Sequence, residues 1–161
     1  MTASVSSSVE PRPGARLAPS APLWLGAAGL LPFLSCAAVL WFGDSSLEAF
    51  VWRLLIGYGA VILSFIGALH WAFAMRATNG ADRRSWALYG WSVVPALIGW
   101  VALSVGPPVV AVLTLIAGFA VQYLFDLRHR HALDLPGWFV PLRGVLSFVA
   151  VICLGVAALS S

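Results

Sequence analysis

Long apolar stretches separated by short polar ones dominate the pattern of this 161-residue chain. A helix needs about 20 apolar residues to cross the hydrocarbon of a bilayer. Five stretches approach or reach that length, and each predicts one membrane-spanning helix: residues 23–42, 51–75, 86–105, 109–125 and 144–159. The expected fold class is therefore all-α, a polytopic membrane protein built as a bundle of five transmembrane helices.

Residues that start or bend helices support this division. Residues 43–46 read Gly-Asp-Ser-Ser, and Ser45 with Glu48 three positions later has the pattern of a capping box, which predicts the start of the second helix. Pro32 and Pro95 fall inside the first and third stretches. We therefore expect kinks in those two helices.

The composition excludes a water-soluble globule. The chain is 61% hydrophobic and 9% charged, against about 45–50% and 25% in ordinary soluble domains. Residues 1–22 differ from the rest, because they are rich in Ser, Pro and Ala and show no apolar periodicity. They are predicted to form a disordered N-terminal tail, which leaves residues 23–161 as the transmembrane domain.

The arginines predict how the bundle is oriented. All nine cationic residues are arginine. Five crossings place Arg53 on one side and the other eight on the side of the N-terminus: Arg12, Arg16, Arg76, Arg83, Arg84, Arg128, Arg130 and Arg143. The positive-inside rule then predicts a cytoplasmic N-terminus, or a matrix-facing one in an organelle, and a C-terminus on the far side. Because these arginines are dispersed over short loops, nucleic acid is not an expected partner.

The second stretch carries small residues at helical spacing. Gly57, Ala60, Ser64 and Gly67 recur every three or four positions, which predicts a helix-packing stripe that another helix can approach closely. Arg53 continues the stripe toward the far surface. Its side chain is expected to reach the headgroups, with pairing to an acidic neighbour as the alternative.

A candidate intramembrane polar layer lies nearer the arginine-rich side. His70, Ser92 and Gln122 all fall about 6–9 Å below that surface if their helices are regular. We hypothesise that they form one hydrogen-bonded layer, which Asp126 extends to the water because it shares a helical face with Gln122. Such a layer can be structural, or it can be part of a path for a substrate, an ion or a proton.

No residue pattern predicts a catalytic or cofactor site. Asp126, His129, His131 and Asp134 are residue types that bind transition metals, but Arg128 and Arg130 interleave with them and would repel a cation, so no metal is expected. Cys36 and Cys153 lie in apolar runs, where each is expected to be a buried hydrophobe. The chain also lacks the zinc-protease, nucleophile-elbow and phosphate-loop motifs. No cofactor and no enzymatic activity are therefore predicted.

Four segments resemble a known family. The run from Tyr58 to Trp71, YGAVILSFIGALHW, is similar to the core signature of the transmembrane protein 69-like family catalogued as domain of unknown function 3429. Residues 91–97, 118–122 and 136–143 resemble its later blocks. The resemblance implies a multi-pass protein of bacterial inner membranes, or of mitochondria in eukaryotic relatives, and brings no established activity. The lysine-free, alanine-rich composition is typical of a GC-rich bacterium and favours the inner membrane.

Three functions remain in competition. The leading expectation is a non-enzymatic packing or assembly component that associates with itself or with another membrane protein, in contact with the lipid bilayer. The first alternative is a small transporter or channel that uses the polar layer around His70. The second is an intramembrane enzyme, which the missing motifs disfavour.

Overall fold

The computed structural model describes residues 20–77, 83–130 and 135–160, and in these ranges the chain is helical without strands. The elements are α1 (Ser20–Ala28), α2 (Leu31–Phe42), the short 3₁₀-helix η1 (Ser45–Leu47), α3 (Glu48–Ala77), α4 (Arg83–Ser104), α5 (Pro108–His129) and α6 (Phe139–Leu159). Together they provide five helical segments long and apolar enough to cross a membrane, with α1 and α2 forming the first. The predicted all-α fold with five spans is confirmed.

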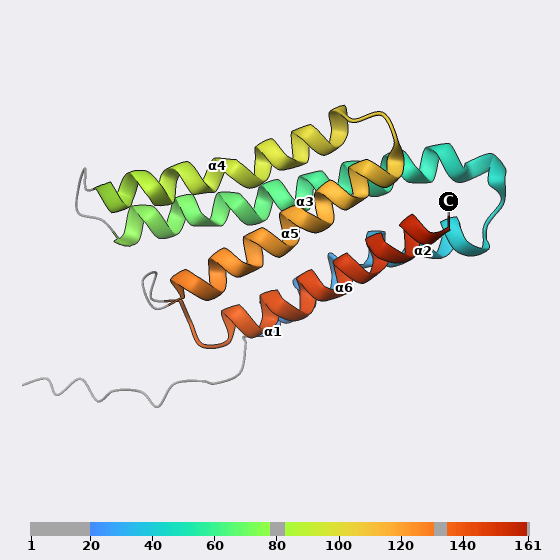
Figure 1. The fold of residues 1–161 in the computed structure, drawn as a ribbon. Coiled ribbons are helices and arrows are strands. Elements are labelled where there is room, and N and C mark those ends of the chain that lie inside the picture. The colour runs from blue at the N-terminus through green and yellow to red at the C-terminus, as the bar shows by residue number, and fades with distance from the viewer. Residues whose placement is uncertain (1–19, 78–82, 131–134, 161) are drawn as a thin grey trace, which may run out of the picture.

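The helices run along a common direction and form one bundle (Figure 1). α3 packs along α4, α5 packs against α3, α4 and α6, and α2 lies between α3 and α6. The two described ends of the chain, Ser20 and Ser160, lie at opposite ends of the bundle. We call one of these ends the basic end, because α3 and α5 finish there and α4 and α6 begin there, bringing six arginines: Arg76, Arg83, Arg84, Arg128, Arg130 and Arg143.

Helix boundaries differ from the prediction in the first and the last span. The helical chain begins at Ser20, so the last residues of the expected tail 1–22 belong to α1, while residues 1–19 lie outside the described part. α6 begins at Phe139 rather than at residue 144. Pro141 fits the first turn of that helix, where no backbone N–H is needed. The earlier start places Arg143 inside α6 and not in the preceding loop.

The connection between α2 and α3 is capped by a different residue from the one predicted. The carboxylate of Asp44 accepts a hydrogen bond from the backbone N–H of Ser46, at 2.9 Å, and caps η1. This bond lowers the pKa of Asp44, because it stabilises the charged carboxylate. The expected capping box of Ser45 and Glu48 is therefore wrong: an aspartate is an equally good N-cap residue, and it lies one position earlier.

The two intramembrane prolines act differently. Upstream of Pro32 the helix is interrupted at Gly29 and Leu30, and the hydroxyl of Tyr58 on α3 donates a hydrogen bond of 2.8 Å to the carbonyl of Gly29. A polar side chain from a neighbouring helix thus satisfies a backbone group at the interruption. α4, by contrast, continues through Pro95 without interruption.

The small residues of α3 pack against α4 of the same chain. A Cβ atom added to Gly67 would lie 2.7 Å from the ring of Pro95, and one added to Gly99 would lie 3.0 Å from the backbone of Ala60. Gly57 has no such neighbour, since an added Cβ would meet nothing within 4 Å. The Ser64 hydroxyl donates to the carbonyl of Ala60 within its own helix. Part of the predicted stripe is therefore a contact inside the bundle.

This contact predicts that Gly67→Ala destabilises the protein by about 1–3 kcal/mol, because the rigid ring of Pro95 cannot move aside without shifting α4. The matched control is Gly57→Ala, which adds the same methyl group to the same helix in open space and is expected to be neutral or stabilising. Thermal unfolding of both variants in detergent micelles measures the difference. Equal effects of the two substitutions would contradict the close packing at Gly67.

Candidate functional site

A cluster of buried polar side chains joins three helices near the basic end. His70 comes from α3, Gln122 and Asp126 come from α5, and Arg143 comes from α6. Their exposed fractions are 1%, 1%, 0% and 7%, respectively. Ionisable groups this deeply buried in a membrane helix are costly unless they find partners. Their pairing therefore decides whether the bundle is stable.

Asp126 is the hub of the cluster. Its Oδ1 accepts a hydrogen bond from Nε2 of Gln122 at 3.1 Å and lies 2.9 Å from Nε2 of His70. Its Oδ2 lies 3.1 Å from Nη2 of Arg143, which forms an ion pair. One carboxylate thus links α3, α5 and α6.

The hydrogen bonds determine the protonation of His70. The indole Nε1–H of Trp91, on α4, can only donate, and it donates to Oε1 of Gln122 at 3.2 Å. The amide nitrogen of Gln122 therefore faces Asp126 and Nδ1 of His70, which lies 3.4 Å away and must accept. The imidazole of His70 is consequently neutral, with its proton on Nε2, the nitrogen that lies 2.9 Å from Oδ1 of Asp126. Trp91 also brings the fourth helix into the network.

Aromatic rings surround this network. The ring of Phe125 stacks on Trp91 at 4.1 Å between centroids and meets the edge of His70 at 5.3 Å. Phe73 contacts His70 on another side and also meets Phe139. These rings keep water away from the polar groups, which strengthens the electrostatic interactions inside the cluster.

The charges in the cluster balance. The negative charge of Asp126 is matched by the positive charge of Arg143, and His70 is neutral in the arrangement described above. A neutral, hydrogen-bonded set can be buried at moderate cost, whereas removing one member leaves a bare charge in a medium of low dielectric constant. Chemically, the arrangement is a set of polar contacts that holds the helices together.

The structure brings together three of the four residues of the hypothesised layer, but not the fourth. Ser92 is buried, yet its hydroxyl donates at 2.6 Å to the carbonyl of Tyr89 in its own helix. Asp126 differs from the expectation as well, because it is fully buried at the hub and does not extend the layer to water. The carboxylate is turned inward because His70 and Arg143 supply its partners there.

Two residues of the cluster were not anticipated as members. The sequence analysis places Arg143 in the loop before the last span, because a charged residue was not expected inside a span. The helix and its apolar run nevertheless begin before Arg143, at Phe139. Trp91 was not among the residues that the sequence pattern singled out. A buried indole N–H needs an acceptor, and this need is the signal that could have linked Trp91 to Gln122.

The remaining candidates contribute little to a site. Of the four metal-ligand types near the end of α5, His131 and Asp134 lie outside the described residues, and Asp126 is engaged in the cluster. His129 contacts the carbonyl of Phe125 through Nδ1 at 3.0 Å. At the far end of the bundle, Arg53 is exposed and donates to the carbonyl of Ala49.

Comparisons with known proteins identify relatives but no activity. The model of the family described as "Protein of unknown function (DUF3429)" matches residues 18–159. Transmembrane protein 69 of Xenopus tropicalis is 36% identical over 138 residues, which cover 85% of this chain and 53% of that protein. The mouse protein of the same name is 29% identical over 138 residues, covering 83% of this chain and 54% of its own length. The chain thus spans about half the length of these curated relatives. No solved structure matches it.

The cluster predicts a strong energetic coupling between Asp126 and Arg143. Asp126→Asn keeps the shape of the side chain but leaves the guanidinium of Arg143 buried without a counter-charge, so it is expected to destabilise the protein by about 3 kcal/mol. The double variant Asp126→Asn/Arg143→Gln removes both charges and is expected to recover a large part of this loss. Chemical unfolding in micelles measures each free energy of unfolding.

Arg53→Gln is the control, because it removes an exposed arginine in the membrane domain and is expected to change stability by less than about 0.5 kcal/mol. Strictly additive effects of the two substitutions in the cluster would show that the two side chains do not interact.

Proposed function

We propose that this chain, which belongs to the DUF3429 family of membrane proteins of unknown function, is a non-enzymatic packing or assembly component of its membrane. The observation that carries the proposal is the mutual pairing of the buried polar side chains of the cluster. His70, Gln122 and Asp126 are each at most 1% exposed and pair with one another. Such a cluster can stabilise a rigid bundle without contacting a substrate.

The same observation favours packing over transport. A path for ions or protons needs polar groups that meet water from at least one side of the membrane. The rings of Phe73 and Phe125 lie against His70, and Asp126 has no exposed surface. We therefore regard transport through the cluster as the second candidate. The buried histidine is the feature in its favour.

A partner helix would have to use a surface other than the Ala60 and Gly67 stripe, since α4 already covers it. We propose the outer face of α3 and α4. There a hollow of about 450 Å³ is lined by small side chains and flanked by larger ones: Ala68, Ala72, Ala96, Trp71 and Met75. Small residues let a second helix approach closely in a membrane. The partner is a second copy of this chain or another membrane protein.

For orientation and location, we propose a cytoplasmic N-terminus in a bacterial inner membrane. The support is the concentration of arginines at the basic end, which the positive-inside rule assigns to the cytoplasm. A mitochondrial membrane, with the same end facing the matrix, is the alternative.

The proposal predicts a protein neighbour on one side of the bundle. A photo-crosslinking amino acid at Ala72, in the hollow, is expected to give a discrete crosslinked product in native membranes. The matched control is the same probe at Leu124, an exposed position of α5 that is expected to label lipid alone. Mass spectrometry of the product distinguishes a second copy from another protein. Lipid labelling at both positions would contradict the packing function.

A flux assay separates the two candidate functions. Purified protein in liposomes with an internal pH-sensitive dye is expected to release a proton gradient no faster than empty liposomes, because His70 and Asp126 are sealed from water. Flux that is lost in His70→Gln would support the transport alternative and overturn the packing proposal.

A further inference from the structure

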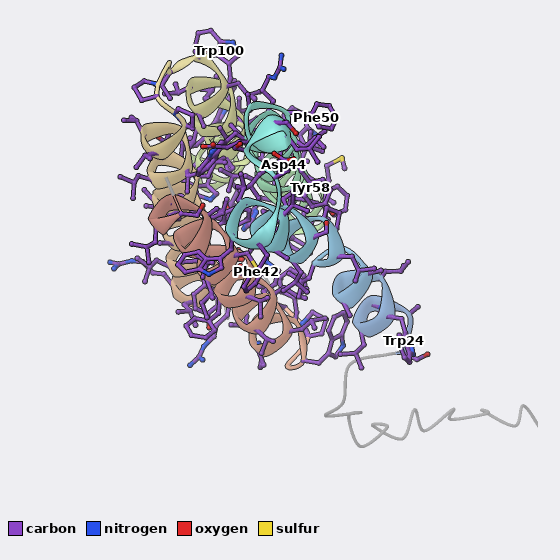
Figure 2. The ribbon with its side chains drawn as sticks, turned by 90° about the vertical axis from the view of Figure 1, so that its right-hand side faces the viewer. Trp24, Phe42, Asp44, Phe50, Tyr58 and Trp100 are labelled. Atoms are coloured by element: carbon purple, nitrogen blue, oxygen red, sulfur yellow. The ribbon has the colours of Figure 1, made fainter. Side chains whose placement is uncertain are left out.

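A lateral cleft opens between α1 and the rest of the bundle. Its volume is about 480 Å³, within the range of roughly 300–1,000 Å³ that is typical of small-molecule sites. Its walls are mainly apolar side chains, among them Leu25 of α1, Phe65 and Leu69 of α3, and Leu142 and Leu146 of α6. No residue of α1 is buried. Figure 2 shows this helix, marked by Trp24, leaning away from the others.

Hydrocarbon is the expected filler of this cleft. The cleft lies among helices that span the membrane, so lipid chains surround it. An apolar gap left empty forfeits dispersion contacts along its walls, and a flexible chain that enters the gap recovers them. An acyl chain is therefore a better match to the walls than water or a soluble polar molecule.

A polar group at the edge of the cleft indicates what the chain is attached to. Arg143 lines the cleft, and its side chain is more than nine-tenths buried. Nη2 is paired with Asp126, but Nε has no acceptor among the described residues and is itself buried. A buried guanidinium with an unpaired N–H is costly, and an anion beside the guanidinium would offset part of that cost. Arginine presents its donors as a planar fork that matches a phosphate.

The charges near Arg143 favour an anion at this position. The groups that face it are Asp126, which already accepts from Nη2, the neutral His70 beyond it, and the ring of Phe139 at 5.9 Å. Beyond these, the basic end carries the exposed Arg128 and the arginines that begin α4. The described acidic residues Asp44 and Glu48 lie at the other end of the bundle. Clusters of arginine at a membrane surface attract anionic headgroups.

The depth of Arg143 is also suitable. It lies four residues into α6, which is about 6 Å along the helix axis and within reach of the headgroup region. Trp138, which also lines the cleft, directly precedes α6, where an indole ring commonly marks the membrane interface. The start of α6 adds the positive end of a helix dipole nearby.

From these observations we propose that the cleft is a binding site for one anionic phospholipid. One acyl chain lies between α1, α3 and α6, and the phosphate lies against the guanidinium of Arg143. The ligand is bound through both parts: the apolar walls hold the chain, and the guanidinium selects a charged headgroup. The proposal does not depend on whether the bundle has a protein partner.

Native mass spectrometry of the full-length protein tests the site. The protein is exposed to equal amounts of phosphatidylglycerol and phosphatidylethanolamine with identical acyl chains. Because one favourable charge contact contributes about 1 kcal/mol, the phosphatidylglycerol adduct is expected to exceed the other about fivefold. Equal retention of the two lipids would overturn the proposal.

Three variants separate the contribution of the apolar cleft from that of the guanidinium of Arg143. Leu146→Trp fills the cleft and is expected to abolish retention, whereas Val145→Trp, one position away on the outward face, should leave retention unchanged. Arg143→Lys keeps a positive charge beside Asp126 but lacks the guanidinium fork, so it should bring the two lipids toward parity. If Arg143→Lys does not fold, the pair at positions 145 and 146 still decides the matter, because equal retention in those two variants would overturn the cleft as the site.

A last control distinguishes a lipid site from a site for a free anion. Soluble glycerophosphoglycerol, which carries the same headgroup without acyl chains, is added in excess. It is expected not to displace the bound lipid, since the chain provides much of the affinity. Displacement by this headgroup alone would show an anion site and overturn the proposal of a lipid.

Discussion

A carboxylate placed among membrane-spanning helices must be paired, and this requirement organises the bundle. Asp126 has no exposed surface, lies 2.9 Å from His70 of α3, accepts a hydrogen bond from Gln122 of its own helix and forms an ion pair with Arg143 of α6. Hydrocarbon offers no substitute for these partners. The three helices must therefore meet at this level, and their apolar contacts toward the far end follow from that common point. Phe33, Leu63 and Phe119 belong to the buried core there.

The same requirement makes the cluster specific. Apolar side chains of similar size can often replace one another, but the acceptor of Gln122 must face the indole of Trp91 and its donor must face Asp126. Rotating or sliding one helix would break several of these bonds at once. A network of this kind thus selects one arrangement of α3, α4, α5 and α6 among the many that purely apolar helices could adopt.

Depth along a helix could be predicted from the sequence, but direction around it could not. The constant rise per residue predicted that His70 and Gln122 lie at the same depth in the membrane. In the structure Nδ1 of His70 lies 3.4 Å from Nε2 of Gln122. The same reasoning put Ser92 at this level too, yet its hydroxyl bonds to its own helix. Which way each side chain faces depends on packing between helices, and a single sequence carries no direct record of it.

Charge marks one end of the bundle but was a misleading guide to where helices begin. The arginines gather at the basic end, but treating Arg143 as part of a loop made the last predicted span begin too late, at residue 144. The energy of a buried arginine depends on its partner, and Asp126 lies 17 residues away on another helix. The unpaired Nε of Arg143 likewise emerges only from the assembled structure.

The protonation of His70 provides the most direct test of the account. Solid-state NMR of the protein labelled with ¹⁵N-histidine in lipid bilayers at neutral pH reports which ring nitrogens carry hydrogen, and His70→Gln assigns the signal. The account predicts a neutral imidazole with its proton on Nε2, close to a carboxylate. A doubly protonated ring, or a proton on Nδ1, would contradict the closed cluster around Asp126.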